Sequence, residues 1–389
     1  MRGLKYISWA DTTGYATAAK ACVRGLLDAG VELTWTPMLL GRERYEVQSL
    51  TDWPCAKLGP VCNWAIDYDT VVIHTVPEYY PALIEQERQV GRRIFGYTVW
   101  ELENLPAHWP AILNQLDGLL VPCQWNVEVC RRSGVTVPIH VVPHMSQFED
   151  LSAAGNTAHA ALQARLPAMA EPPFVFYTVG HWSNRKAQHL TLQAYWQAFN
   201  ADEPVLLIVK TTPHDTTRRE RHWRNAFRRR FPTTARSLAR LSQGVNKPAA
   251  VALIADEALS DEQMLALHEH GDCFVSLTRT EGWGMGAFEA ARLGNPVVIT
   301  GYGGQLDFLD PVSSYLVDYT LVPVHEPLAD SYDATQCWAE ADVGQAARLL
   351  RQVYQERIAA RERAAQQAQR ISTQFGKTAV INAFIKALA

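Results

Sequence analysis

Short apolar runs alternate with longer amphipathic stretches along almost the whole chain. In the first half, the apolar runs predict strands at residues 5–9, 31–36, 70–75, 93–99, 118–121 and 139–142. The stretches between them predict helices at residues 17–29, 80–89, 108–115 and 126–133. Gly30, Gly91 and Gly134 follow predicted helices, as is typical of helix ends. Strands that alternate with helices predict a parallel sheet with crossover helices.

A second alternating series follows residues 149–173, which we interpret as a linker with a helical piece because Ala and Pro are frequent there. Its predicted strands are residues 174–179, 205–210, 251–254, 273–277 and 296–299. Its predicted helices are residues 190–199, 261–270 and 287–293, with further helices at 343–371 and 378–388. The pattern predicts two α/β domains, at residues 1–165 and 170–370, and a terminal helix at 371–389.

The composition is typical of a globular protein with two domains. The chain has 389 residues, of which 48% are hydrophobic and 20% charged, and its net charge is −4. No apolar run suits a transmembrane helix or the core of a signal peptide, so we expect a cytoplasmic protein. Seven scattered cysteines favour reduced thiols over disulfides. Cys55 and Cys62 lack a second ligand pair, so no zinc site is expected.

Residues 280–289, TEGWGMGAFE, combine a glycine-rich loop with two glutamates. The segment lies between a predicted strand and a predicted helix, whose N-terminus favours negative charge. The loop residues that offer their backbone to a ligand are Gly282, Gly284, Met285 and Gly286. Glu281 and Glu289 flank this cradle and suit neighbouring hydroxyls. The segment therefore indicates a nucleotide sugar, and the alternative is a tight turn in which Glu289 only favours the helix N-terminus.

A basic loop, residues 180–186, follows the first predicted strand of the second half. Ligands of parallel α/β sheets bind at the carboxyl ends of strands. Arg185 and Lys186 can neutralise a pyrophosphate there, and Gly180 allows close backbone approach. Lys210 ends another predicted strand and either contacts the same phosphates or extends into solvent. The alternative for the loop is a solvated basic turn.

Together these segments resemble the E-x7-E glycosyltransferases of the GT-B fold, the retaining group called family 4. The resemblance covers most of the chain and is strongest at residues 97–144 and 180–307. It implies two Rossmann-like domains that face each other across a cleft, an N-terminal acceptor domain and a C-terminal donor domain. It also implies that the terminal helix crosses back onto the first domain. Transfer with retention, without a metal or other cofactor, is implied as well.

The resemblance assigns roles to individual residues. Glu281 contacts the hydroxyls of the donor sugar and Glu289 the ribose. His181 stands where many members have an arginine, which makes Lys186 the stronger phosphate ligand.

Candidates for the acceptor side lie in the first half. Glu101 follows a predicted strand at a position where many family members carry a histidine. Glu101, or Glu103 after a small shift, is expected to orient the acceptor hydroxyl or act as the base. Gly14 and Tyr15 follow the first predicted strand, and the resemblance places this loop beside the acceptor. A simple turn is an equally good interpretation of that loop.

Several other patterns favour structural roles. Asp67 and Asp69 match the metal-binding D-x-D pattern of the other main glycosyltransferase fold, but they precede a strand, which favours a turn or strand start. His74 and His144 end predicted strands and are interpreted as core or rim histidines. Residues 301–307, GYGGQLD, are predicted to line a cleft.

The basic cluster, from Arg218 to Arg230, is the segment that indicates a polyanionic partner. We interpret it as an amphipathic surface helix with aromatic residues inward and arginines in solvent. Peripheral contact with an anionic membrane at the inner face is the second interpretation, and no nucleic acid is expected.

The combined interpretation is a glycosyltransferase of polysaccharide biosynthesis. It would move a sugar from a UDP- or GDP-sugar to a hydroxyl of a glycan, a lipid-linked glycan or another acceptor. A nucleotide-sugar epimerase of the same fold is the alternative, and a nucleic-acid-binding protein that uses the basic cluster is a more distant one.

Overall fold

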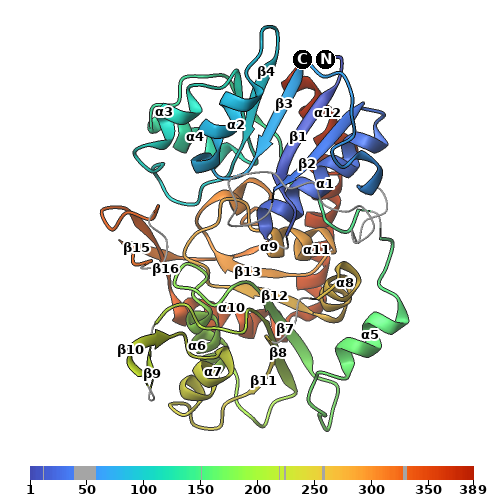
Figure 1. The fold of residues 1–389 in the computed structure, drawn as a ribbon. Helices are drawn as coiled ribbons and strands as arrows, with labels where there is room; N and C mark the ends of the chain where they lie inside the picture. The colour runs from blue at the N-terminus through green and yellow to red at the C-terminus, as the bar shows by residue number, and fades with distance from the viewer. Residues whose placement is uncertain are drawn as a thin grey trace. The chain divides into compact units, whose positions relative to one another are not determined.

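The computed structural model describes residues 1–11, 13–38, 58–149, 151–218, 220–222, 225–255, 259–326 and 331–389, with the backbone alone at 220–222 and 225–230. The chain divides into two compact units, coloured along the chain in Figure 1. Unit 1 comprises Met1–Asp150 and Ser372–Ala389, and unit 2 comprises Leu151–Ile371. The division falls at residue 150 and not at the expected 165, because helix α5 (Asn156–Gln163) packs on α8 (Asp261–His270) of unit 2.

Unit 1 contains a six-stranded parallel sheet in the order β2-β1-β3-β4-β5-β6. Its strands are β1 (Leu4–Trp9), β2 (Leu33–Met38), β3 (Thr70–His74), β4 (Arg93–Tyr97), β5 (Gly118–Val121) and β6 (Ile139–Val141). The helices between them include α1 (Gly14–Asp28), α2 (Tyr80–Glu87), α3 (Trp109–Leu113) and α4 (Gln124–Arg132). The parallel sheet with crossover helices predicted for the first half is confirmed.

The last helix of the chain, α12 (Lys377–Leu388), packs on unit 1 beside α1 (Figure 1). Val380, Ile381 and Phe384 are buried in the same core as the strand residues of this unit. The Arg93 guanidinium at the start of β4 donates to the Leu388 carbonyl at 2.5 Å. A segment from the end of the chain therefore completes the core of the first sheet.

Unit 2 contains a second six-stranded parallel sheet, in the order β11-β8-β7-β12-β13-β14. Its strands are β7 (Phe174–Val179), β8 (Val205–Lys210), β11 (Ala250–Ile254), β12 (Cys273–Ser276), β13 (Val297–Thr300) and β14 (Tyr315–Val317). Its other helices include α6 (Gln188–Ala198), α7 (Thr234–Ser242), α9 (Met285–Arg292), α10 (Val343–Gln355) and α11 (Arg357–Gln374). The tandem arrangement of two wound sheets agrees with the alternating pattern of the second half.

The basic cluster is not the amphipathic helix that we expected. Its backbone forms the antiparallel strands β9 (Glu220–His222) and β10 (Asn225–Arg230), and helix α7 starts only at Thr234. Residues 219, 223 and 224 of the cluster lie outside the described residues.

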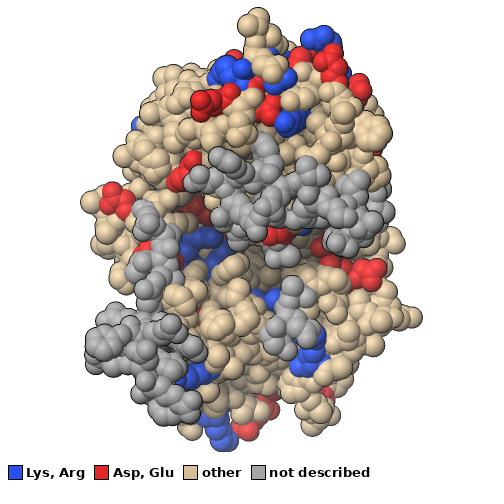
Figure 2. Space-filling view, in the orientation of Figure 1, with Lys and Arg blue, Asp and Glu red and all other residues tan. Residues whose placement is uncertain are grey.

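Basic and acidic side chains are interspersed on the face of the molecule drawn in Figure 2. On the face drawn in Figure 2, the coloured lysine and arginine side chains occur in small groups, several beside acidic residues. The coloured residues form no broad basic surface on this face. None of the helices in the described ranges is both long and apolar enough to cross a bilayer.

A second antiparallel strand pair was also not predicted from the sequence. Strands β15 (Tyr319–Pro323) and β16 (Cys337–Ala341) pair in antiparallel fashion beside the sheet of unit 2. The cysteines in the described part of the chain are free thiols, and Cys55 lies outside that part.

Buried histidines make the stability of both units depend on pH. Burial lowers the pKa of His144 in unit 1 to about 3. Burial and the nearby charge of Arg292 lower the pKa of His268 in unit 2 to about 3. Both rings stay neutral in the folded protein, whereas the unfolded chain takes up these protons below an ordinary pKa of about 6.5. The free energy of unfolding should therefore fall as the pH is lowered from about 6.5 to about 3. Each of the two histidines contributes about 1.4 kcal/mol to this fall for every pH unit.

We expect the thermal midpoint of unit 2 to fall between about pH 8 and about pH 5, and His268→Asn to reduce that fall. Asparagine offers a polar atom near the position of Nδ1, which lies 2.9 Å from the Tyr177 hydroxyl. Calorimetric scans across this range test the prediction. An unchanged pH dependence in the variant would contradict it.

Candidate functional site

The candidate donor residues gather at the carboxyl edge of the sheet of unit 2. The basic loop follows β7, Lys210 ends β8, and the glycine-rich loop follows β12. These three strands are neighbours in a parallel sheet, so their carboxyl ends open on one edge. This is the edge at which wound α/β sheets bind ligands.

Glu281 joins the glycine-rich loop to the basic loop. Its carboxylate lies 2.5 Å from Lys186 Nζ and 3.2 Å from Arg185 Nη1. Arg185 also donates to the Thr280 carbonyl at 3.0 Å. The three charged side chains, Glu281, Arg185 and Lys186, are called the charge triad below. The triad brings together residues that lie about ninety-five positions apart in the chain.

The charge triad is largely shielded from water. Glu281 is 7% exposed, and the side chains of Arg185 and Lys186 are 20% and 19% exposed. Burial alone would raise the pKa of Glu281, but the charges of Lys186 and Arg185 outweigh it and lower that pKa below its ordinary value. Glu281 is therefore a carboxylate at neutral pH, bound to two cations that a diphosphate would also attract.

Two further predicted residues lie close to the triad. The backbone N–H of Gly180 donates to the Lys210 carbonyl at 3.0 Å, which ties the start of the basic loop to the end of β8. Partial burial and three nearby cations lower the pKa of His181. Those cations are Lys186, Arg185 and Lys210. His181 is therefore neutral at neutral pH and lies within the electrostatic range of these three cations.

The glycine-rich loop leads directly into helix α9. Gly284 precedes the helix with φ +89°, a backbone conformation that residues with a Cβ rarely adopt. Met285 and Gly286 form the first turn, whose N–H groups have no partner within the helix. Gly282 belongs to the same loop and is buried. The loop and the helix N-terminus therefore have the backbone geometry of an anion site.

Glu289 lies one turn further along α9. It is 1% exposed, and its carboxylate accepts from Arg292 Nε of the same helix at 3.3 Å. Glu281 and Glu289 thus bind different cations, and the charge triad contains only the first of the two glutamates.

A second glycine loop holds the backbone of Glu281. The Gly304 N–H donates to the Glu281 carbonyl at 2.8 Å. Gly303 has φ +103°, and a Cβ there would lie 2.7 Å from the same carbonyl oxygen. The sequence predicted only that residues 301–307 line a cleft, whereas the structure shows that they support the central carboxylate.

The candidates for the acceptor side belong to unit 1. Tyr15 donates to the Val99 carbonyl at 2.9 Å and contacts the Thr98 hydroxyl at 3.0 Å, beyond the end of β4. Burial raises the pKa of Tyr15, and the charge of Glu101 adds to that rise, so Glu101 lies near this tyrosine. Gly14 starts α1 with ordinary backbone geometry, and a Cβ there would meet nothing within 4 Å. Tyr15 and Glu101 therefore share a neighbourhood, and the backbone at Gly14 would accept a side chain.

The residues interpreted as structural have structural contacts. Arg2 lies 3.5 Å from Asp67 and 3.8 Å from Asp69, which precede β3 at the amino edge of its sheet. The His74 ring stacks on Tyr97 at 4.0 Å, and the Tyr97 hydroxyl contacts His144 at 3.0 Å. Asp67 and Asp69 stay at a strand start, and the two histidines belong to a buried aromatic stack.

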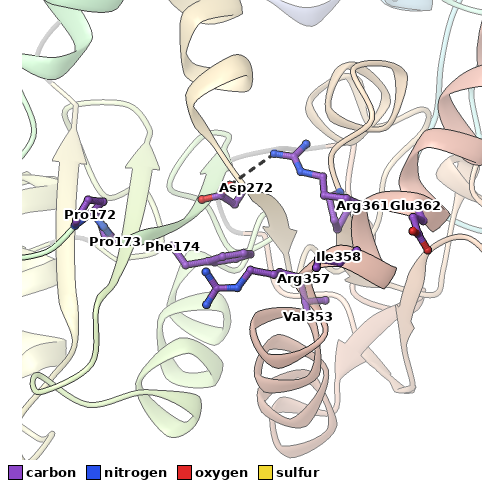
Figure 3. Close-up of a pocket in the computed structure, with 10 residues that line it drawn as sticks. Pro172, Pro173, Phe174, Asp272, Val353, Arg357, Ile358, Arg361 and Glu362 are labelled. Carbon is purple, nitrogen blue, oxygen red and sulfur yellow. Dashed lines mark ion pairs between the residues drawn. The ribbon is translucent and has the colours of Figure 1, made fainter.

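A cavity of about 540 Å³ lies at the opposite, amino-terminal edge of the sheet of unit 2 (Figure 3). Phe174, Asp272 and Pro296 line it where β7, β12 and β13 begin. Arg361 pairs with Asp272 at 3.6 Å and donates to Asn295 at 2.5 Å, so its guanidinium ties this edge together. The cavity contains none of the candidate donor residues.

Sequence reasoning missed Arg279 and Glu326, two charged residues beside the triad. The Glu326 carboxylate accepts from the Arg185 N–H at 3.3 Å, and the Arg279 N–H donates to the Arg185 carbonyl at 2.8 Å. Glu326 lies after β15, in the hairpin that the apolar pattern did not predict. Arg279 carried one available signal, which is its position two residues before Glu281.

No protein-family model matches the chain, and no curated protein sequence matches it significantly. The structure nevertheless matches solved structures along its whole length. HepE of Anabaena, in complex with UDP and glucose, is 12% identical with a TM-score of 0.66, over 100% of this chain and 99% of that one. Sucrose-phosphate synthase of Thermosynechococcus elongatus is 15% identical with a TM-score of 0.69, over 99% of this chain and 98% of that one. WaaG, a glycosyltransferase involved in lipopolysaccharide biosynthesis, is 12% identical with a TM-score of 0.61, over 98% of each chain. The predicted GT-B fold is confirmed.

The packing of Gly303 on Glu281 gives a test of the loop geometry. We expect Gly303→Ala to destabilise unit 2 by about 2 kcal/mol, because the new Cβ meets the Glu281 carbonyl in a strained backbone conformation. Gly14→Ala should leave stability unchanged or slightly raised, because its Cβ meets nothing within 4 Å. Thermal unfolding of both variants measures the difference. Equal midpoints for Gly303→Ala and the wild type would contradict the described packing.

Proposed function

We propose that the protein is a retaining, metal-independent glycosyltransferase that uses a nucleotide-sugar donor. The observation that carries the proposal is the charge triad, a buried carboxylate between two cations at the carboxyl edge of unit 2. The glycine-rich loop and the start of α9 add backbone donors at the same edge. Support also comes from the HepE structure, which has the same fold and was solved with UDP and glucose.

In this proposal the diphosphate of the donor binds Arg185 and Lys186. The acceptor hydroxyl oxygen forms a bond to the anomeric carbon while the bond from that carbon to the diphosphate oxygen breaks. The electron pair of the broken bond stays on the nucleoside diphosphate, whose added charge the two cations stabilise. The hydroxyl proton passes to an oxygen of the departing diphosphate, on the face from which the acceptor attacks. Glu101 orients the acceptor.

The contacts of Glu281 suggest how donor binding proceeds. Without a donor, Glu281 pairs with both cations and offsets part of their charge. A diphosphate brings more negative charge and replaces the carboxylate as their partner. Glu281 is then released to accept hydroxyl groups of the donor sugar. Binding of the diphosphate and recognition of the sugar are therefore coupled through one carboxylate.

Lys186 provides the direct test of the proposed function. A thermal-shift screen with UDP-, GDP-, ADP- and dTDP-sugars should identify a donor, because a ligand of the folded state raises the midpoint by mass action. Lys186→Ala should remove that shift and lower transfer by about two orders of magnitude. Lys247→Ala is a matched control, because Lys247 pairs with Asp202 on the exposed surface of the same unit.

Two results would contradict the proposal. Transfer at the wild-type rate by Lys186→Ala would show that the charge triad does not take part in the reaction. Formation of an epimerised, still activated sugar from the donor alone would instead indicate the nucleotide-sugar epimerase.

The proposed exchange of partners predicts opposite effects of one substitution. Glu281→Gln should bind the nucleoside diphosphate of the identified donor about tenfold more tightly, because the competing carboxylate is gone. The same variant should transfer sugar more slowly, because the amide is a weaker acceptor for the sugar hydroxyls. Glu289→Gln is the matched control and should not tighten diphosphate binding, since Glu289 pairs with Arg292. Calorimetry with the diphosphate alone measures the affinity of both variants. Weaker binding by Glu281→Gln would contradict the proposed exchange of partners.

A further inference from the structure

The hairpin of β15 and β16 touches the basic loop of the candidate donor site. The Ala339 N–H of β16 donates to the Arg279 carbonyl at 3.0 Å. Glu326, which follows β15, accepts from the Arg185 N–H at 3.3 Å. The hairpin therefore contacts both segments that carry the charge triad, the segment before Glu281 and the segment around Arg185.

The side chain of Arg279 joins the hairpin to the basic loop. Its Nε donates to Glu340 of β16 at 2.6 Å, and its Nη1 donates to the Asn184 carbonyl at 2.6 Å. The guanidinium carbon lies 5.1 Å from the ring of Trp338, which is buried beneath it. Only 12% of the Arg279 side chain is exposed. One cation is thus held by a carboxylate, a carbonyl and an indole ring.

The backbone near Arg279 holds the next residue of the loop. The Arg279 N–H donates to the Arg185 carbonyl at 2.8 Å, and the Thr278 hydroxyl donates to the same oxygen at 3.3 Å. Arg279 therefore fixes Asn184 through its side chain and Arg185 through its backbone. We call Arg279, Trp338 and Glu340 the arginine clamp.

The clamp opposes the electrostatic repulsion between the two cations of the basic loop. Arg185 and Lys186 are adjacent cations that converge on one carboxylate, and their mutual repulsion favours a loop that separates them. A loop held in place before the ligand arrives also loses less conformational entropy when a diphosphate binds.

We propose that Arg279 is a positioning residue for the donor diphosphate. Resting on the proposed function, this inference assigns to the hairpin the role of holding Arg185 and Lys186 where a diphosphate can bridge them. Arg279 acts through the basic loop and does not itself contact the donor.

Arg351 provides a matched control for a merely structural arginine. It pairs with Glu203, donates to the Ala198 carbonyl and lies 4.4 Å from the Phe199 ring, all within unit 2. Arg279 and Arg351 therefore have the same three kinds of contact, a carboxylate, a carbonyl and an aromatic ring. Only the contacts of Arg279 lead to the charge triad.

The first experiment needs no ligand and compares Arg279→Gln with Arg351→Gln by hydrogen exchange. Arg279→Gln should raise the exchange rate of the amides in residues 180–189 by about tenfold, and Arg351→Gln should leave it unchanged. An unchanged rate in folded Arg279→Gln would overturn the clamp, whatever the protein binds.

The second experiment measures the Kd of the nucleoside diphosphate, chosen among UDP, GDP, ADP and dTDP by the largest thermal shift of the wild type. Arg279→Gln should raise this Kd about tenfold, whereas Arg351→Gln should not change it. Equal affinity of Arg279→Gln and the wild type would overturn the positioning role. A wild type that binds none of the four would instead contradict the proposed function, while the exchange result still decides the clamp.

Conservative variants cover the case in which Arg279→Gln does not fold. Arg279→Lys keeps the charge but loses the forked geometry that reaches Glu340 and Asn184 together, so an intermediate rise in Kd is expected. Glu340→Gln keeps the shape of the clamp and should give a smaller rise than Arg279→Lys. Wild-type exchange and wild-type Kd in both variants would overturn the proposal.

Discussion

The buried carboxylate of Glu281 is the group on which the arrangement of the candidate site depends. It lies out of water and is stabilised there by Lys186 and Arg185. A buried charge that loses its partners is strongly destabilising, so the loops that carry these residues must stay together. The glycine loop at Gly303 and Gly304 supports the same residue from its backbone side. The loops beyond β7, β12 and β13 thereby become one site.

This constraint also gives the site its chemistry. Two cations held beside a carboxylate are partly neutralised, so they suit a ligand with more negative charge than the carboxylate itself. A diphosphate meets that condition, and a sugar attached to it offers hydroxyls to the released carboxylate. The arginine clamp supports this arrangement from outside the triad, because it holds the backbone of the loop that carries both cations.

The pattern of apolar residues was sufficient for the sheet of unit 1 and for five strands of the sheet of unit 2, but it missed the edge strand β14 and most segments outside the sheets. Strands and helices at the centre of each unit were predicted because buried parallel strands appear as continuous apolar runs between amphipathic helices. The basic cluster was misinterpreted because its aromatic spacing fits a helix, whereas its backbone pairs as β9 and β10. The hairpin of β15 and β16 was missed because β15 is mostly exposed, so its sequence shows no apolar pattern typical of a buried strand. Arg279 and Glu326 stayed unnoticed for the same reason, since Glu340, the partner of Arg279, and Glu326 itself lie on that hairpin.

The sequence by itself determined the alternation of strands and helices at the centre of each unit and the residue types at the strand ends of unit 2. Those features are local, because apolar periodicity and glycine loops are properties of neighbouring residues. Only the tertiary structure decided that Glu281 pairs with Lys186 and Arg185, that Glu289 pairs with Arg292, and that Arg279 ties the basic loop to Glu340. Most of these contacts join residues far apart in the chain. Their geometry follows from strand order and from how the loops pack on one edge of a sheet, which no local pattern specifies.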